Sequence, residues 1–356
     1  MSMIGKDMSG ENQALYFTAH PRSFEDFRYV YPVVSRRAGG ISLGVNLNLD
    51  KTCNFHCIYC QVDRPAWKKG LPMALGAESV SAPGLASAST EALHTPPEDS
   101  PLPETKPAPP SLGERPNIFI DLQRLTAELE SILQLWRSGQ LFTIRPFSGL
   151  PPELRRLNDI ALSGDGEPTL YRNFPQIVAC CAEVRRRHRL EDLKLVLITN
   201  ASLLDQPHVQ EGLALLDQNN GEIWAKLDAG SEDYFRQVAR TKVPLERIVR
   251  NIQEAARLRL LVIQSLFMRI AGQGPSVEEQ AAYCQRLQEI LEAGGRIKLV
   301  QIYTIARAPA EPIVSALPPE DLQAIAALVR QTTGLLVAVF PAPEPSSADS
   351  NRSKSS

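Results

Sequence analysis

The sequence predicts an α/β fold in which helices cover a parallel β-sheet. Short, continuously apolar, β-branched segments alternate six times with segments whose apolar residues recur at helical spacing. With 356 residues, 43% of them hydrophobic, the chain is long enough for one large domain or two modest ones. Six such units can form an open doubly wound sheet or a partial (β/α) barrel, and periodicity alone leaves both open.

The predicted strands and helices follow one another along most of the chain. The clearest strand is 193–199, with the sequence LKLVLIT, and the clearest helix is 277–293, which ends at Gly294 and Gly295. The expected strands are 41–49, 158–162, 193–199, 222–227, 260–267 and 297–303, with a further apolar run at 335–340. The expected helices are 121–136, 174–189, 209–216, 245–259, 277–293 and 319–332.

Two segments are rich in proline or serine and poor in apolar residues. Residues 64–116 hold eleven of the 28 prolines, so we predict a disordered insertion there, with a proline-rich ligand for a partner as the alternative. Residues 341–356 are predicted to be a disordered tail. The rest divides into an N-terminal arm at 1–40, a core at 41–309 and a C-terminal helix and strand at 310–340.

The charge balance and the hydropathy exclude several classes of protein. Lys and Arg total 38 against 40 Asp and Glu, and the net charge of −2 provides no basic field for nucleic acid or an anionic membrane. No apolar run approaches the roughly 18 residues of a membrane helix. Residues 1–13 lack the pattern of a secretory signal. The sequence therefore predicts a cytoplasmic protein with no membrane partner.

Three of the six cysteines fall within eight positions. Cys53, Cys57 and Cys60 form a C-x3-C-x2-C triplet directly after the first predicted strand, a grouping typical of metal ligation. Three thiolates can hold three irons of a [4Fe-4S] cluster and leave the fourth iron open. A zinc site, with His56 or a distant residue as fourth ligand, is the alternative. The other cysteines lie inside predicted helices, where we expect them to be buried: Cys180, Cys181 and Cys284.

Further motifs stand at the ends of later predicted strands. They are Ser163-Gly164-Asp165-Gly166-Glu167-Pro168-Thr169, Thr199-Asn200, Lys226-Leu227-Asp228-Ala229-Gly230 and Tyr303-Thr304-Ile305-Ala306-Arg307. Together with the aromatic Tyr59 inside the cysteine triplet, their order and placement resemble the radical S-adenosylmethionine (radical SAM) superfamily. The resemblance covers about 41–309, apart from the insertion.

This resemblance implies a partial (β/α)6 barrel with a [4Fe-4S] cluster at its mouth. In that family the open iron is chelated by S-adenosylmethionine (SAM), and one-electron reduction by a donor such as flavodoxin or ferredoxin yields methionine and a 5′-deoxyadenosyl radical. The cluster ligands would be Cys53, Cys57 and Cys60. The residues implied to bind SAM are Tyr59, Gly164, Gly166, Glu167, Pro168, Asn200, Lys226, Asp228 and Arg307.

The residue types at these positions suit such a cofactor. Glycines at 164 and 166 allow backbone to approach a ligand closely. Lys226 and Asp228 are two apart on a strand, so they face the same side and can contact a carboxylate and ribose hydroxyls; a mutual ion pair is the alternative. Arg307 can clamp a substrate anion or the SAM carboxylate, with a surface salt bridge as the alternative.

The subgroup that the chain resembles is the iron–sulfur oxidoreductases related to wybutosine biosynthesis. Val45-Asn46-Leu47-Asn48, Asp50-Lys51 and Gln301-Ile302-Tyr303-Thr304 carry this likeness. Wybutosine enzymes act on tRNA and have further cysteines before the triplet, whereas this chain has none before Cys53. We therefore expect a small-molecule substrate. The alternatives are modification of tRNA, which the charge does not support, activation of a partner protein, and a non-catalytic iron–sulfur or zinc module.

Overall fold

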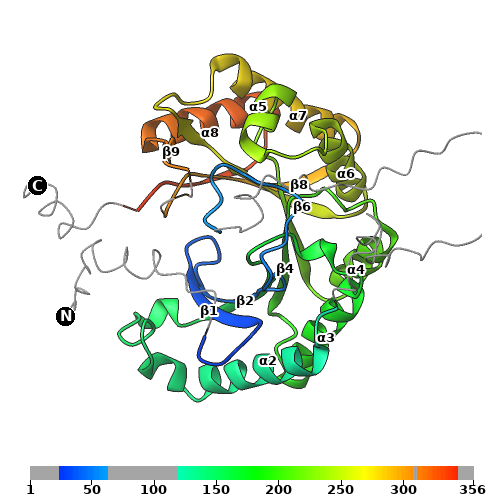
Figure 1. Ribbon diagram of the computed structural model, residues 1–356, viewed down its shortest axis with the longest axis vertical. Helices are drawn as coiled ribbons and strands as arrows, with labels where there is room; N and C mark the ends of the chain where they lie inside the picture. Colours follow the sequence, from blue (N-terminus) through cyan, green and yellow to red (C-terminus); the bar gives the residue numbers. More distant parts are fainter. Residues whose placement is uncertain (1–23, 63–118, 308, 310, 344–356) are drawn as a thin grey trace, which may run out of the picture.

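The computed structural model describes residues 24–62, 119–307, 309 and 311–343 (Figure 1). The predicted disordered insertion at 64–116 lies outside the described residues, as do residues 1–23 of the predicted arm and 344–356 of the predicted tail.

The main sheet contains eight strands, and all its pairings from β2 to β10 are parallel. Only β1 is antiparallel to its neighbour within this sheet. The strands are, in spatial order, β1 (Val30–Ser35), β2 (Gly40–Val45), β3 (Leu157–Leu162), β4 (Lys194–Thr199), β5 (Gly221–Lys226), β6 (Leu260–Leu266), β8 (Arg296–Tyr303) and β10 (Val337–Phe340). The sheet curls into an open half-barrel, as Figure 1 shows, so the predicted partial (β/α)6 barrel is confirmed and the doubly wound sheet is not.

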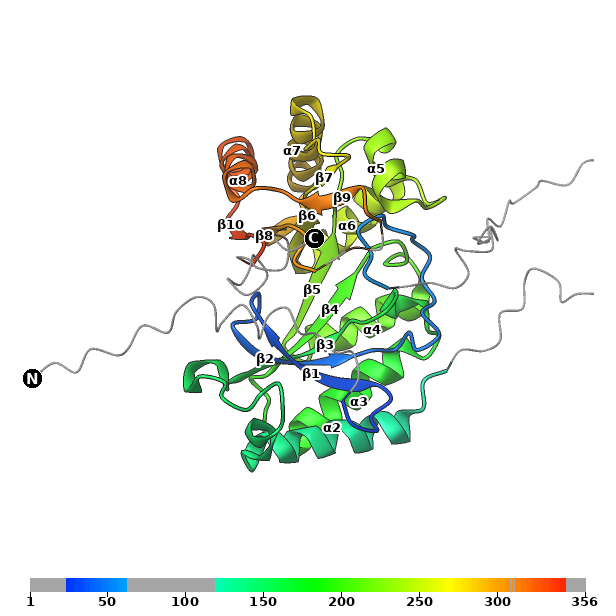
Figure 2. The ribbon, with the colours of Figure 1, turned by 60° about the vertical axis from the view of Figure 1, so that its left-hand side comes forward.

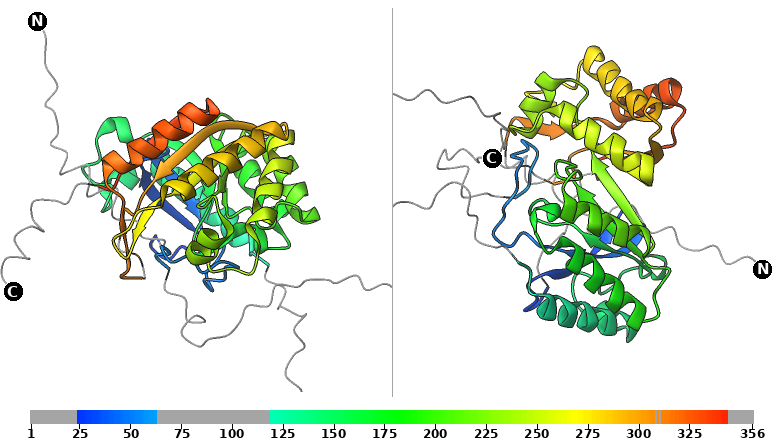
Figure 3. Two further views of the ribbon diagram at one scale, coloured as in Figure 1. Left: turned by 90° about the horizontal axis from the view of Figure 1, so that it is seen from above. Right: turned by 90° about the vertical axis from the view of Figure 1, so that its right-hand side faces the viewer.

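Helices lie along the convex side of the curled sheet (Figures 1 and 3). They are α2 (Leu122–Arg137), α3 (Phe174–Arg187), α4 (Pro207–Asp217), α5 (Glu232–Ala239), α6 (Leu245–Leu258), α7 (Val277–Glu292) and α8 (Pro319–Thr333). Side-chain caps start three of them, because Asp121, Ser231 and Ser276 each accept a hydrogen bond from a backbone N–H in the first turn. No helix in the described part of the chain is long and apolar enough to cross a membrane.

The apolar periodicity explains why these elements pack. Leu125, Leu129, Ile132 and Leu133 repeat at helical spacing in α2, and all four are at most 1% exposed. The parallel strands β2, β3 and β4 are buried along most of their length on both faces, which is why their sequences are mostly apolar. The resulting core lies between the helices and the convex face of the sheet.

Of the α-helices and strands in the described residues, four were not predicted from the sequence. β1 lies in the predicted N-terminal arm and contains Pro32, which argues against a strand except at a sheet edge, the position that β1 occupies. Helix α5 has only eight residues. A separate antiparallel pair joins β7 (Met268–Ile270) to β9 (Val314–Ala316). Both segments have three residues, too few for a periodic signal.

The parallel strands bring their carboxyl ends to one edge of the sheet (Figure 2). The segments that follow β2, β3, β4, β5 and β8 at this edge carry the sequence motifs described above.

Candidate active site

A pocket of about 340 Å³ lies on the concave side of the half-barrel. At the carboxyl ends of the strands it is lined by all three residues of the cysteine triplet and by Lys226 and Asp228. At the other end it is lined by residues of the β1–β2 turn and by inward-facing side chains of β3 and β5. The strands that form the wall thus connect a cysteine-bearing mouth to a floor inside the barrel.

The loop that carries the cysteines is fixed by α5. The backbone N–H of His56 donates to the carbonyl of Ala239 at 3.0 Å, and that of Ile58 donates to Val238 at 2.9 Å. The rings of Phe55 and Phe235 pack edge to face with their centroids 5.8 Å apart. These contacts hold the loop over the pocket even though it is not part of the sheet.

The three thiols have the chemistry of cluster ligands. None of the six cysteines, all of them within the described residues, forms a disulfide. Burial, followed by the proximity of Cys53, raises the pKa of the Cys57 thiol to about 12. Among the described residues no three His, Cys, Asp or Glu side chains are grouped closely enough to hold a metal ion. Three half-buried cysteines on one short loop still supply the donor type that an iron–sulfur cluster requires, and no second cysteine group joins them.

The glycine-rich turn after β3 packs against the segment that leads into the cysteine loop. A Cβ at Gly164 would lie 2.2 Å from Asn46 Oδ1, and one at Gly166 would lie 1.9 Å from the carbonyl oxygen of Thr52. Both glycines line the pocket, but the atoms closest to them belong to the protein's own backbone and side chains rather than to a ligand. They therefore set the distance between the turn and the cysteine loop.

Glu167 joins the ends of β3 and β4. Its Oε1 accepts hydrogen bonds from the Thr199 hydroxyl at 2.7 Å and from both the hydroxyl and the backbone N–H of Thr169. Its Oε2 accepts from the backbone N–H of Asn200 at 2.7 Å. Burial raises the pKa of this carboxyl group above its ordinary value. Glu167 lines the pocket, and its oxygens hold the strand ends in place.

Asn200 continues this chain of contacts to the cysteine loop. Its Nδ2 donates to Asn54 Oδ1 at 2.8 Å, and its Oδ1 accepts from the Ser202 hydroxyl at 2.6 Å. Asn54 Nδ2 in turn donates to Ser202 Oγ at 2.7 Å, which closes a buried ring of three side chains. Asn54 was not predicted as a site residue, although its place directly after Cys53 was an available signal.

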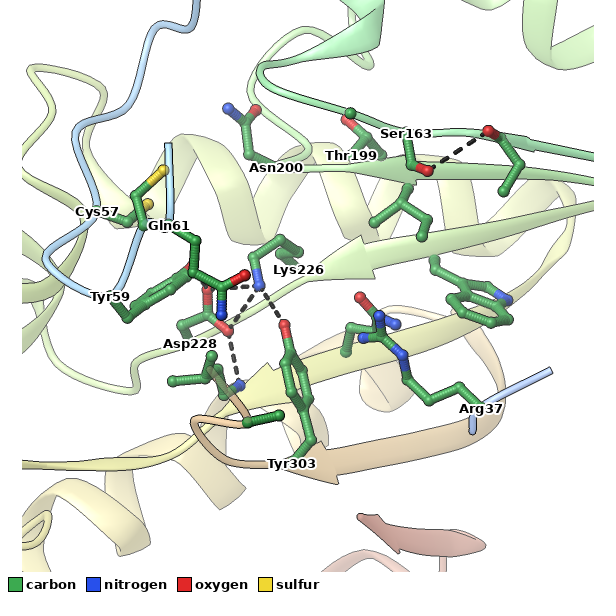
Figure 4. Close-up of a pocket in the computed structure, with 18 of the residues that line it drawn as sticks. Arg37, Cys57, Tyr59, Gln61, Ser163, Thr199, Asn200, Lys226, Asp228 and Tyr303 are labelled. Atoms are coloured by element: carbon green, nitrogen blue, oxygen red, sulfur yellow. Dashed lines mark hydrogen bonds and ion pairs between the residues drawn. The ribbon is translucent and has the colours of Figure 1, made fainter. Parts of the chain in front are cut away.

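Lys226 and Asp228 face the same side of the sheet, as their spacing predicted (Figure 4). Lys226 Nζ lies 3.2 Å from Asp228 Oδ2 and donates to the Tyr303 hydroxyl at 2.7 Å. Asp228 also accepts from the Tyr59 hydroxyl at 2.5 Å and from the backbone N–H of Leu266 at 2.8 Å. Burial lowers the pKa of Lys226, but the combined effects of Asp228, of Tyr303 and its hydrogen bond, and of Cys57 outweigh burial, and the pKa is raised. The ion pair considered as an alternative is therefore present, and it stands inside the pocket.

The remaining predicted residues divide between the pocket and the core. Arg307 lines the pocket, and its carbonyl accepts a weak hydrogen bond from Gln61 Nε2 at 3.5 Å. Pro168 is buried at the start of a short 3-10 helix, Pro168–Leu170. Three cysteines lie in the helices outside the pocket; Cys181 and Cys284 are buried as predicted, whereas Cys180 is half-buried.

No protein-family model matches this chain. Two curated relatives share parts of its sequence. It is 23% identical over 229 residues to the GTPase Obg of Brachyspira hyodysenteriae and 38% identical over 96 residues to UPF0026 protein slr1464 of Synechocystis sp.. The match to the GTPase Obg covers 64% of this chain but only 23% of the length of that protein. The match to UPF0026 protein slr1464 covers 26% of this chain and 32% of the length of that protein.

Several solved structures match this chain in part, at low sequence identity. SuiB of Streptococcus suis, solved bound to S-adenosylmethionine, has a TM-score of 0.42 at 14% identity, covering 60% of this chain and 43% of its own. A radical SAM methyltransferase from Sphaerobacter thermophilus also has a TM-score of 0.42 at 13% identity, and the match covers 62% of this chain and 57% of the methyltransferase. TYW1 with a lysine-pyruvate adduct bound has a TM-score of 0.40 at 13% identity, and the match covers 83% of this chain and 74% of TYW1.

Proposed function

We propose that this protein is a radical SAM enzyme. One observation carries the proposal: three cysteines from one short loop line the same pocket as the polar residues at the carboxyl ends of β3, β4 and β5. A structural zinc site commonly uses paired cysteine groups, whereas these three cysteines form the one cysteine group that lines the pocket. Three cysteine ligands are what a [4Fe-4S] cluster with one open iron uses.

In this proposal Cys53, Cys57 and Cys60 would hold the cluster. When bound, the cluster supplies an electron to the sulfonium of SAM, whose cleavage gives methionine and a 5′-deoxyadenosyl radical for hydrogen abstraction. The protein's own residues provide the setting. Asn54 and Asn200 fix the loop, and the Lys226–Asp228 pair offers a cation and hydrogen-bond acceptors toward SAM.

The pocket also suits a reactive radical. Its walls are strands of the sheet, and the residues that line it include the apolar side chains of Val196, Ile198 and Leu266. Such walls limit the access of water and of stray hydrogen donors to the reacting atoms. A pocket of about 340 Å³ within the barrel favours a small-molecule substrate. We also propose a cytoplasmic location and electron supply by a flavodoxin or ferredoxin.

Anaerobic reconstitution with iron and sulfide tests the cluster part of this proposal. We expect about four irons and four sulfides per chain, as for a single [4Fe-4S] cluster, and a change in its electron paramagnetic resonance signal when SAM is added after reduction. Cys180→Ala, which removes a thiol outside the pocket, should leave both results unchanged. About eight irons per chain, or bound zinc without iron uptake, would contradict the proposal.

A further inference from the structure

The end of the pocket farthest from the cysteines has its own set of polar side chains. We call this the pocket floor and define it as Arg37, Ser42, Asp159 and Trp224, all of which line the pocket. Figure 4 shows Arg37 lying beyond Tyr303 and Lys226 as seen from Cys57 and Tyr59. The floor is therefore separate from the residues proposed to hold the cluster and SAM.

Arg37 is held by aromatic rings. Its guanidinium carbon lies 5.0 Å from the ring centroid of Tyr303 and 5.8 Å from that of Trp224. Within the described ranges its side chain makes no hydrogen bond or ion pair, although it is half-buried and lines the pocket. A guanidinium that rests on aromatic faces keeps its N–H edge available for bidentate contact with an anion.

The other cations near the floor already have protein partners. Arg36, which also lines the pocket, donates a hydrogen bond to the carbonyl oxygen of Pro341. Lys194 and Lys298 both pair with Glu222, which also accepts a hydrogen bond from Trp224 Nε1 at 2.8 Å. This group fixes the indole ring and gives both lysines a carboxylate partner. Among the described residues, Arg37 is thus the cation near the floor whose N–H groups have no hydrogen-bond partner.

Asp159 determines which anion the floor can accept. It is 4% exposed and accepts a hydrogen bond of 2.5 Å from Ser42, its neighbour in the register of β2 and β3. Burial, opposed by the Ser42 hydroxyl and by Lys194 and Arg37, raises its pKa to about 6. A carboxylate beside the anion site penalises a dianion such as a phosphate monoester more than a monoanion.

We propose that the pocket floor binds the carboxylate group of a small-molecule substrate through Arg37, while Asp159 accepts a hydrogen bond from a hydroxyl or amino group of the same molecule. The proposal rests on the proposed function only in calling that molecule the substrate. It predicts that the pocket floor binds a monoanionic carboxylate more tightly than the matching amide and more tightly than a phosphate monoester.

Matched probes test this preference on the full-length reconstituted protein with SAM present. Ligand-observed NMR would measure the binding of benzoate and benzamide, of phenylacetate and phenylacetamide, and of phenyl phosphate. We expect each acid to bind at least tenfold more tightly than its amide, because only the acid can form a charge-assisted bidentate contact with Arg37. Phenyl phosphate should bind more weakly than benzoate.

Three variants locate the binding. Arg37→Gln should reduce acid binding at least tenfold and leave the amides unchanged. Asp159→Asn should improve the binding of phenyl phosphate. Arg28→Gln is the matched control, because Arg28 also lies over a tyrosine ring, at 5.6 Å, but is exposed and does not line the pocket. Acid binding should be unaffected in Arg28→Gln.

Two results would overturn the inference: acids and amides that bind alike, including a complete lack of binding, or acid binding that persists in Arg37→Gln. Neither result concerns the cluster, whose iron content and response to SAM are measured separately. Failure of the floor proposal is thus distinguishable from failure of the proposed function.

Discussion

Asn200 Nδ2 donates a hydrogen bond of 2.8 Å to Asn54 Oδ1, and this bond joins the end of β4 to the residue after Cys53. Both side chains are buried, so Asn54 Oδ1 and Asn200 Nδ2 depend on each other for a hydrogen bond. Glu167 holds the backbone N–H of Asn200 in turn. The position of the cysteine loop is therefore coupled to the ends of β3 and β4.

Asn200→Ala tests this coupling. The substitution leaves Asn54 Oδ1 without its donor in a buried site, so we expect a loss of about 1–3 kcal/mol in the free energy of unfolding and a lower iron content after reconstitution. Denaturant unfolding and iron analysis measure the two effects. Gln218→Ala, at an exposed position after α4, should change the free energy of unfolding by no more than about 0.5 kcal/mol. Its iron content should equal that of the wild type within the assay error. Full iron retention in Asn200→Ala would show that the loop is fixed by α5 alone.

Gly166→Ala tests the packing of the glycine-rich turn. The added Cβ would lie 1.9 Å from the Thr52 carbonyl oxygen, which belongs to the backbone and cannot rotate away. We expect destabilisation of about 3 kcal/mol or more and loss of cluster binding. At Gly274 the nearest atom to an added Cβ is Leu317 Cδ1 at 3.2 Å, a side-chain end that can move. Equal melting temperatures for Gly166→Ala and Gly274→Ala would contradict the packing argument.

Lys226→Met tests the ion pair in the pocket. Asp228 would remain with its two hydrogen bonds but without its cation, so we expect destabilisation by about 3 kcal/mol and weaker SAM binding, measured by calorimetry on the reconstituted protein. The matched control is Lys298→Met, which breaks a pair whose lysine side chain is 45% exposed and should cost less than about 1 kcal/mol. Unchanged SAM affinity in Lys226→Met would remove Lys226 from the proposed SAM site.

Asp159 predicts a dependence of stability on pH. Burial raises its pKa to about 6 in the folded state, against about 4 when unfolded, so the native state binds more protons between these values. Its contribution to stability is greatest below pH 4 and falls by about 3 kcal/mol as pH rises through 6. The difference in unfolding free energy between the wild type and Asp159→Asn should fall by this amount from pH 4 to 7. A difference that stays flat over this range would place Asp159 in solvent.

Most of the half-barrel could be predicted because its parallel strands are apolar on both faces. The run LKLVLIT became β4 within one residue, and the helix periodicity located α2, α6 and α7. The predictions missed β1, since Pro32 is compatible only with an edge strand and a sequence does not reveal which strand is at the edge.

The site was predictable only where a motif is local in sequence. The cysteine triplet and the Lys-x-Asp pair were found in this way, and the structure places both at one pocket. Asn54, Arg37 and Asp159 were missed because their roles depend on partners more than a hundred positions away in the chain: Asn200, Tyr303 and Ser42, respectively. Such pairings follow from the curl of the sheet, which periodicity does not specify.

The formation of 5′-deoxyadenosine tests the proposed function most directly. The reconstituted protein, reduced with dithionite and given SAM, should release 5′-deoxyadenosine and methionine, slowly even without substrate. Cys57→Ala should abolish this release, because the cluster would lose one of three protein ligands. Cys180→Ala should retain it. No 5′-deoxyadenosine from a wild-type protein with its full cluster, or the same amount from Cys57→Ala as from the wild type, would contradict the assignment.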